Sequence, residues 1–320
     1  MSTADLFRRT LAAIGLALCA LPAAAQNRTP VADPSKCPDL WAEIGLPEGK
    51  PQGKDKFIVI CHLGYVSGHN NVTKAPDWVI ERVRPKLADA TGEATRESQD
   101  FHADELILPP SGRAVPADYD HSGFDQGHQA PAADFKGDQK LLDDTFFYSN
   151  SVPQVGRGFN RSIWRSLETQ VRKLSTGPRD ELYVITGPVY QQARPIKIVR
   201  GADACGAEFT LKGPENGKAS ICPANSDEAD PSARCTNGVA VPVALFKIVY
   251  DAKVQNAFAV LMENKSHTGQ YPSNRTFEYI KKHAVSIGTI EDLTGFSFFS
   301  ALDERRQRQI RQNCATFKFH

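Results

Sequence analysis

The chain has 320 residues, 41% of them hydrophobic, and its formal net charge at pH 7 is +1. This length and composition can bury a large core, so we expect one elaborated domain rather than a string of small ones. The balanced charge excludes a surface that is basic throughout, so a phosphate-rich partner would have to meet locally concentrated positive charge.

The first 25 residues have the three parts of a secretory signal peptide. Arg8 and Arg9 precede an apolar stretch, and three alanines ending at Ala25 follow it. We expect cleavage near Ala25 and a periplasmic or secreted protein. Lipid attachment at Cys19 is the alternative, but Leu18 stands where such a signal needs a small residue. No later stretch reaches the roughly 20 apolar residues of a spanning helix, so no membrane span is expected.

Six cysteines follow this segment, an even number in a chain bound for an oxidising compartment, so disulfides are expected. They are Cys37, Cys61, Cys205, Cys222, Cys235 and Cys314. A zinc site is the alternative, but no Cys-x-x-Cys pair occurs and the spacings are irregular. The spacing does not give the connectivity, although the three cysteines between 205 and 235 favour at least one bridge that holds this stretch.

The segment from Gln26 to Lys54 is rich in Pro, Gly and polar residues, which predicts an irregular arm held by Cys37. The single domain is expected to follow, over residues 55–320. Phe57 to Ile60 has strand character, whereas Ala75 to Arg84 fits a strand and a short helix equally well.

The clearest helical pattern runs from Asn160 to Leu174, where apolar residues recur every three or four positions and charged residues lie between them. Downstream, runs of β-branched and aromatic residues bounded by Gly, Pro and Asn predict an antiparallel sheet. These runs are Leu182 to Thr186, Ile196 to Val199, Val239 to Tyr250 and Ala257 to Met262. Residues 201–237 form a cysteine-containing insertion, and Asp303 to Gln312 is a basic helix. The predicted fold class is therefore α+β.

An imidazole, amide oxygens, a carboxylate and several guanidinium groups occur within about 50 residues, and together they suit phosphodiester hydrolysis. That reaction needs a base, a cation and positive side chains to hold the phosphate. His128 is the candidate base, the preceding Gly127 indicates a tight turn, and Asp125 is placed to orient the imidazole ring. A plain β-turn is the alternative interpretation of Asp125 to Gly127.

Asn160 and Glu168 are eight residues apart, slightly over two turns of the predicted helix, so both can face one ion. Magnesium keeps several of its waters, so one Asn oxygen, with Glu168 holding a water, is chemically sufficient. A helix N-cap is the alternative for Asn160. An ordinary surface ion pair is the alternative for Glu168 and Arg172.

Residues 125–131, Asp-Gln-Gly-His-Gln-Ala-Pro, resemble the Asp-Arg-Gly-His signature of the DNA/RNA non-specific endonuclease family. Further family landmarks follow in the same order between Lys56 and Leu302. They include Ser149, Asn150, Pro153, Gln154, Asn160, Trp164, Leu167 and Glu168. The resemblance implies a ββα-metal (His-Me finger) fold, with a central antiparallel sheet flanked by helices, and hydrolysis of DNA and RNA.

The resemblance also implies roles for single residues. His128 would activate water, Asn160 would bind magnesium or manganese, and Glu168 would position a metal-bound water that protonates the leaving oxygen. Arg96 and Arg172 would grip the phosphate. Substrate-binding and supporting roles fall on Gln126, Arg161, Asp125 and Asn150. A homodimer and an immunity or inhibitor protein are further candidate partners.

The chain departs from the family signature at Gln126, where relatives carry Arg. Loss of one charge-assisted phosphate contact would lower activity by about one or two orders of magnitude, unless Arg157 or Arg161 compensates. Gln126 and the neutral net charge therefore leave an alternative, a catalytically weakened protein that binds nucleic acid or a phosphate ligand. A phosphodiesterase for a small exported substrate is a third hypothesis, and the sequence does not separate DNA from RNA preference.

Overall fold

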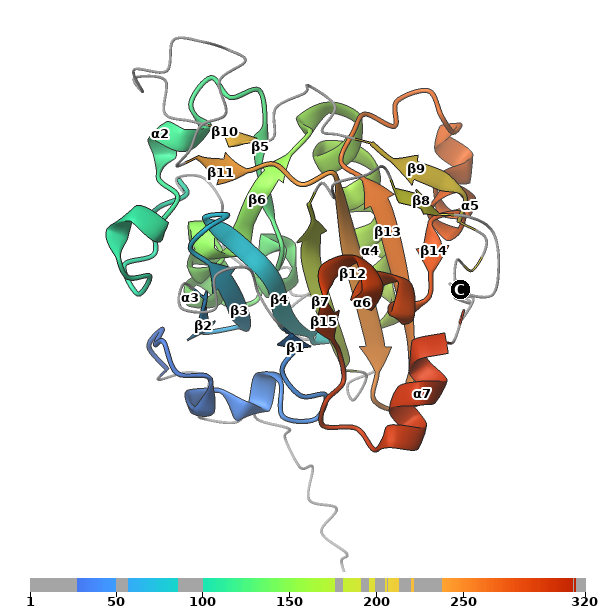
Figure 1. Ribbon diagram of the computed structural model, residues 1–320, viewed down its shortest axis with the longest axis horizontal. Helices are drawn as coiled ribbons and strands as arrows, with labels where there is room; N and C mark the ends of the chain where they lie inside the picture. The colour runs from blue at the N-terminus through green and yellow to red at the C-terminus, as the bar shows by residue number, and fades with distance from the viewer. Residues whose placement is uncertain are drawn as a thin grey trace, which may run out of the picture.

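The computed structural model describes residues 28–49, 57–85, 100–175, 181–190, 196–198, 205, 207–212, 220–221, 238–312 and 314. Its centre is a seven-stranded antiparallel sheet with the strand order β14-β13-β12-β7-β4-β3-β2 (Figure 1). The strands are β2 (Phe57–Cys61), β3 (Tyr65–Asn70), β4 (Ala75–Val83), β7 (Leu182–Val189), β12 (Ala244–Asp251), β13 (Asn256–Glu263) and β14 (Ala284–Val285). The predicted antiparallel sheet and the α+β class are confirmed.

The segment whose type the sequence left open is β4, near the middle of this sheet. Trp78 and Ile80 pack into the core on one face of the sheet, whereas Val79 and Val83 pack into the core on the other. Because both faces are buried, apolar residues occur on both faces of β4 and the two-residue period of a strand is hidden.

The run from Val239 to Tyr250 was predicted as one strand, and this is wrong in detail. The structure divides it into β11 (Val239–Ala240) and β12, which begins at Ala244. Pro242 lies between them and has no N–H group to donate to a sheet ladder, so a break there has a physical cause.

Helices cover both faces of the sheet (Figure 1). One core contains residues of α3, α4 and α5, and the other contains residues of η2, α6 and α7. The α-helices are α2 (Pro116–Tyr119), α3 (Gln139–Asp144), α4 (Arg165–Leu174), α5 (Thr276–Lys281), α6 (Ile287–Thr294) and α7 (Glu304–Gln312). The short helical turns are η1 (Pro34–Lys36), η2 (Pro38–Leu40), η4 (Pro110–Gly112), η5 (Ala132–Phe135), η6 (Tyr148–Asn150), η7 (Gly156–Trp164) and η8 (Ser273–Arg275). The predicted C-terminal helix is thus confirmed as α7.

Four two-stranded sheets complete the fold. They pair β1 (Glu48–Gly49) with β15 (Phe296–Ser297), β5 (Asp125–His128) with β6 (Ser151–Gln154), β8 (Ile196–Ile198) with β9 (Phe209–Leu211), and β10 (Ser220–Ile221) with β11. Strands β9 and β10 come from the predicted insertion at 201–237, most of which lies outside the described residues.

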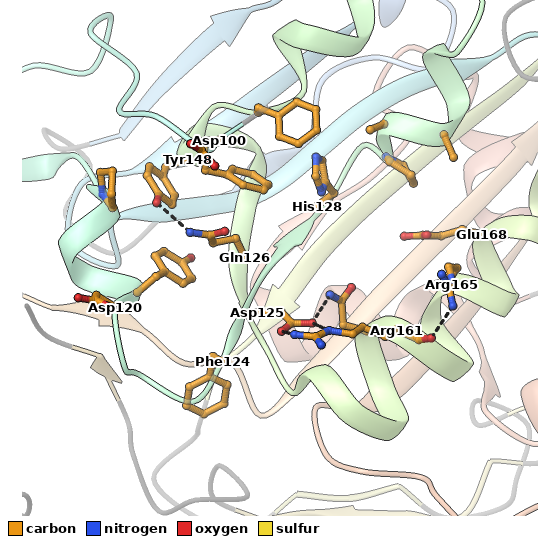
Figure 2. Close-up of a pocket in the computed structure, with 18 of the residues that line it drawn as sticks. Asp100, Asp120, Phe124, Asp125, Gln126, His128, Tyr148, Arg161, Arg165 and Glu168 are labelled. Carbon is orange, nitrogen blue, oxygen red and sulfur yellow. Dashed lines mark hydrogen bonds and ion pairs between the residues drawn. The ribbon is translucent and has the colours of Figure 1, made fainter. Parts of the chain in front are cut away.

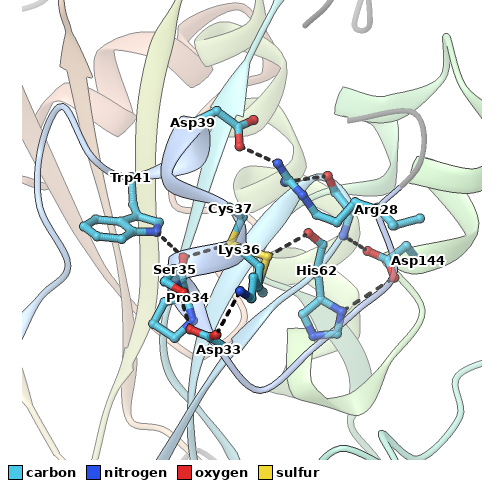
Figure 3. The surroundings of a disulfide bond; sticks show 12 residues. Arg28, Asp33, Pro34, Ser35, Lys36, Cys37, Asp39, Trp41, His62 and Asp144 are labelled. Carbon is cyan, nitrogen blue, oxygen red and sulfur yellow. Dashed lines mark hydrogen bonds and ion pairs between the residues drawn. A yellow bond between two sulfur atoms is a disulfide. The ribbon is translucent and has the colours of Figure 1, made fainter. Parts of the chain in front are cut away.

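Two disulfides occur among the described residues, Cys37–Cys61 and Cys205–Cys314. The first joins the N-terminal arm to the end of β2 (Figure 3), as expected for Cys37. Cys222, Cys235 and the predicted signal segment lie outside the described residues. Among the residues that are described, no helix combines the length and the apolar character needed to cross a bilayer.

Candidate active site

A cleft of about 1170 Å³ opens between strand β5, the loop after α2 and helix α4 (Figure 2). Seven of the nine residues predicted for the site line it: Asp125, Gln126, His128, Asn160, Arg161, Glu168 and Arg172. Asn150 lies behind the cleft, and Arg96 falls outside the described residues. Residues that are up to 47 positions apart in the sequence therefore converge on one cavity.

The cleft is built on a hairpin followed by a helix. Strand β5 pairs antiparallel with β6, so that His128 lies opposite Ser151, and the chain then continues through η7 into α4. This arrangement is the ββα unit that the sequence resemblance implied. The expected tight turn at Gly127 is wrong, because Gly127 is in β5. Packing requires glycine at this position, because a Cβ there would lie 2.1 Å from the side chain of Gln154.

Two aromatic rings flank the imidazole of His128. The ring centroids of Phe101 and Phe146 lie 4.6 and 4.9 Å from that of His128, and all three side chains line the cleft. The imidazole thus lies at the edge of the core, where its position is fixed by packing while it still faces the cleft. Such placement suits a general base.

The carboxylate of Asp125 organises the metal-binding candidate rather than the imidazole. It accepts hydrogen bonds from Asn160 Nδ2 at 2.8 Å and from Arg161 Nε at 2.7 Å, and it forms an ion pair with Arg161. The expectation that Asp125 orients His128 is therefore wrong. Since the amide nitrogen of Asn160 is occupied by Asp125, its amide oxygen remains for another ligand.

The N-cap interpretation of Asn160 is also wrong. Arg157 and Gly158 have non-helical backbone, helical backbone follows Gly158, and the side chain of Asn160 bonds to Asp125 instead of to a backbone N–H. The backbone N–H of Asn160 donates to the Val155 carbonyl at 2.9 Å, which makes a wide first turn. This turn, combined with the hairpin, places Asn160 within reach of Asp125.

Glu168 and Arg172 lie on α4, but they are not the simple surface ion pair that spacing allows. Arg172 donates to the buried carboxylate of Asp134 at 2.5 Å and to Thr169 Oγ1 at 3.0 Å. Burial raises the pKa of Glu168 to about 7, against the effect of Lys247 and the nearby arginines. Both side chains face the cleft.

Asn150 supports the hairpin from behind. Its side chain is fully buried, its Oδ1 accepts from the Ala130 N–H at 2.8 Å, and its Nδ2 donates to the Ala130 and Thr145 carbonyls at 3.0 and 2.9 Å. The amide therefore fixes the chain directly after His128, and it does not line the cleft.

The second wall of the cleft contains Gln126, at the position where the sequence resemblance led us to expect Arg. Its Nε2 donates to the hydroxyl of Tyr148 at 3.1 Å, and the Tyr148 ring stacks on Tyr119 with 5.2 Å between centroids. Figure 2 shows Gln126 and Tyr148 on one side of His128, and Arg161, Arg165 and Glu168 on the other.

The expected local excess of positive charge is not found in the cleft, because Asp100, Asp120, Asp125 and Glu168 line it together with four basic residues. Arg161, Arg165, Arg172 and Lys136 all line the cleft. Lys136, Arg165 and Asp134 were not predicted as site residues. Arg165 could have been predicted as a site residue from its four-residue spacing to Arg161. Asp134 could not, because the turn η5 that carries it reaches the site through tertiary packing alone.

The donor set fits a hydrated hard cation. No group of three or more His, Cys, Asp or Glu side chains able to hold a metal occurs in the described part of the chain. A closed protein cage is therefore not what these residues form. An amide oxygen of Asn160 and the Glu168 carboxylate facing the same cleft suit magnesium, which retains several waters when a protein binds it.

Known proteins were compared with this chain. The model of the family described as DNA/RNA non-specific endonuclease matches residues 47–305. A solved structure of EndoG in complex with EndoGI has a TM-score of 0.63 and 28% sequence identity, and the match covers 86% of this chain and 96% of that chain.

Curated relatives agree with this match. The chain is 44% identical over 126 residues to the mitochondrial nuclease of Saccharomyces cerevisiae, and 31% identical over 246 residues to a nuclease of Syncephalastrum racemosum. It is 39% identical over 153 residues to bovine mitochondrial endonuclease G. These matches cover 39%, 76% and 48% of this chain, and 37%, 68% and 47% of the relatives. The fold is that of a ββα-metal nuclease, and the chain belongs to the DNA/RNA non-specific endonuclease family.

Proposed function

We propose that this protein is an exported, magnesium-dependent endonuclease that hydrolyses phosphodiester bonds of DNA and RNA without sequence specificity. One observation carries the proposal: His128 on β5 and Asn160 on η7 face the same cleft, and Asp125 engages the Asn160 amide nitrogen so that its oxygen is left for a cation. The two described disulfides support a location in an oxidising compartment, periplasmic or extracellular.

The mechanism follows from the positions of these side chains. His128 accepts a proton from the attacking water while that water's oxygen bonds to phosphorus and the bond from phosphorus to the leaving oxygen breaks. Arg172, held in place by Asp134, and Arg161 stabilise the negative charge on the phosphate oxygens. Asn160 and Glu168 would hold a magnesium ion with its waters. When bound, the ion supplies positive charge to the phosphate and makes its waters more acidic.

Digestion of plasmid DNA and of RNA by the purified protein, with magnesium and with EDTA, tests the proposal. We expect cleavage that EDTA abolishes, and His128→Ala should lower kcat by about 100- to 10,000-fold because a general base is lost. His102→Ala is the matched control, since His102 is exposed and does not line the cleft. Binding of nucleic acid without EDTA-sensitive cleavage would instead favour the weakened binding protein that Gln126 suggests.

A further inference from the structure

Three arginines line the cleft, and they differ in how their charge is balanced. Arg161 forms an ion pair with Asp125, and Arg172 forms one with Asp134. Each carboxylate offsets part of the positive charge of its arginine. These two guanidinium groups therefore meet a substrate as positioned but partly neutralised donors.

Arg165 is the third of these arginines, and its charge is not offset in this way. Its guanidinium forms no ion pair with a carboxylate of the described residues, and its Nη2 donates to the Arg161 carbonyl at 3.0 Å. That bond uses one of the five N–H donors of the group and none of its charge. The side chain is exposed on α4 and lines the cleft. Arg165 therefore carries a full positive charge that a phosphate entering the cleft can meet.

The side chains of Arg165 and Arg172 point to different parts of the cleft. The hydrogen bond to the Arg161 carbonyl directs Arg165 back toward the start of the helix. Arg172 follows seven residues later, about 10 Å along the helix axis, and its guanidinium is held by Asp134 on η5. The two guanidinium groups therefore suit two different phosphates.

The opposite wall of the cleft is unfavourable for phosphates. Asp100 and Asp120 line the cleft on the other side of His128 from Arg165 (Figure 2), and their carboxylates repel a phosphate. Lys136 is another lining cation without an ion pair among the described residues, but an ammonium group cannot make the bidentate contact of a guanidinium. A substrate strand is therefore expected to place its phosphates along η7 and α4.

We propose, on the basis of the nuclease function above, that Arg165 is a substrate-binding residue, which engages the phosphate next to the scissile one on the same strand. This contact lies outside the reacting group, so it is equally strong in the ground state and the transition state and acts on KM rather than on kcat. A phosphate carries no sequence information, so the contact fits cleavage without sequence specificity.

Binding of a short, fluorescein-labelled single-stranded DNA in EDTA tests the contact without turnover. Arg165→Gln should raise Kd about tenfold, as expected for one charge-assisted contact, and the slope of log Kd against log salt concentration should fall by about 0.7. Arg165→Lys keeps the charge without the planar fork, so its Kd should lie between these two values.

Arg305→Gln is the matched control for the loss of one positive charge. Arg305 is exposed on α7, which packs on the other face of the sheet, and it forms no ion pair with a carboxylate of the described residues. It does not line the cleft, so neither Kd nor the salt slope should change.

Cleavage with magnesium separates binding from chemistry. With the same DNA as substrate, Arg165→Gln should raise KM about tenfold while kcat stays within about twofold of the wild type. A dinucleoside monophosphate has no phosphate beside the scissile one. The substitution should therefore lower kcat/KM for it by far less than for the longer strand.

The proposal is overturned if Arg165→Gln binds the labelled DNA as tightly as the wild type, or if Arg305→Gln loses as much affinity. A fall in kcat with unchanged KM would also overturn it, because Arg165 would then act on the chemistry through Glu168, one turn away. Failure of the nuclease function is seen separately, as a wild-type protein without EDTA-sensitive cleavage. In that case the binding measurement in EDTA would still decide whether Arg165 contacts the phosphate backbone.

Discussion

Gln126 precedes Gly127 and His128 on β5, and it lies across the cleft from Arg161 and Arg165 (Figure 2). Its amide reaches only the hydroxyl of Tyr148 among the described residues. Arg161 and Arg165 therefore lie on one side of the cleft, and a neutral hydrogen-bonding group lies on the other, at the position where the sequence resemblance led us to expect Arg.

Introducing a guanidinium with Gln126→Arg should raise kcat/KM by about one to two orders of magnitude, because a charge-assisted phosphate contact is gained. The dependence of kcat/KM on salt should also steepen by roughly one phosphate contact. Both are measured by cleavage of a duplex oligonucleotide over a range of salt concentrations. Gln126→Met is the control for loss of the Tyr148 hydrogen bond, and a slower Gln126→Arg enzyme would show that this cleft is adapted to Gln.

The segment that joins the hairpin to the helix depends on Gly158. This residue has φ of +85°, a conformation that other residues rarely adopt, and it turns the chain from an extended residue, Arg157, into the helix that carries Asn160. A Cβ at Gly158 would lie 2.3 Å from Ser266 Oγ and 2.5 Å from Thr268 Oγ1. A side chain at position 158 would therefore meet both backbone strain and close packing.

Gly158→Ala should lower the free energy of unfolding by about 1–3 kcal/mol and reduce magnesium-dependent cleavage, since Asn160 is displaced with the turn. Urea denaturation and kcat measure the two effects. Gly269→Ala is matched, because Gly269 has φ of +79° with no atom within 4 Å of an added Cβ, and it should cost backbone strain alone while activity is retained. Equal results for the two variants would contradict the role given to Gly158.

The elements differ in how far the sequence alone predicts them. The helix from Asn160 to Leu174 was predicted because its apolar stripe packs on one face of the sheet, so its period survives in the sequence. The β5–β6 hairpin was implied only by the family resemblance and not by any strand pattern, because each strand has only four residues, one contains Gly127 and the other Pro153, and 22 residues separate them. The motif predicted the site residues, but it did not predict that Asp125 bonds to Asn160 and Arg161, because these contacts depend on the hairpin.

Buried charges are a further case that sequence patterns do not reveal. Lys247 lies in an apolar run, and a lysine in such a strand is expected to face solvent. In the structure, however, the residue lies inside the sheet and is only 1% exposed. The same holds for Asp134, whose pairing with Arg172 joins a turn to a helix 38 residues later. Such contacts come from tertiary structure and carry no local period.

At the scale of the whole molecule, a buried histidine links the sheet to the catalytic hairpin. His62 follows β2 and its disulfide cysteine, and its Nε2 lies 3.3 Å from Asp104 while its Nδ1 lies 3.5 Å from Asp144 at the end of α3 (Figure 3). Ser149, next to the hairpin strand β6, donates to Asp104 at 2.6 Å. The cluster thus joins the end of β2 to Asp104, which precedes His128 in the sequence, and to Asp144 and Ser149, which follow it.

The cluster predicts how stability changes with pH. Burial lowers the pKa of His62, but the carboxylates of Asp144 and Asp104 outweigh it and raise the pKa to about 9. Because the folded pKa lies above the usual 6.5, protonated His62 stabilises the protein fully below pH 6.5, and this contribution is lost as the pH rises through 9. One proton corresponds to a slope of at most about 1.4 kcal/mol per pH unit.

The stability of the wild type relative to His62→Gln isolates this effect from other titrating groups. Chemical denaturation should show a difference in unfolding free energy that is constant below pH 6.5 and shrinks between pH 6.5 and 9. The same cluster lowers the pKa of Asp104 to about 2. The contribution of Asp104 to stability is therefore lost at acidic pH, as the pH falls from the usual pKa of 3.8 through 2. A difference that does not vary with pH would mean that folding leaves the pKa of His62 unchanged and that His62 joins the layers by packing alone.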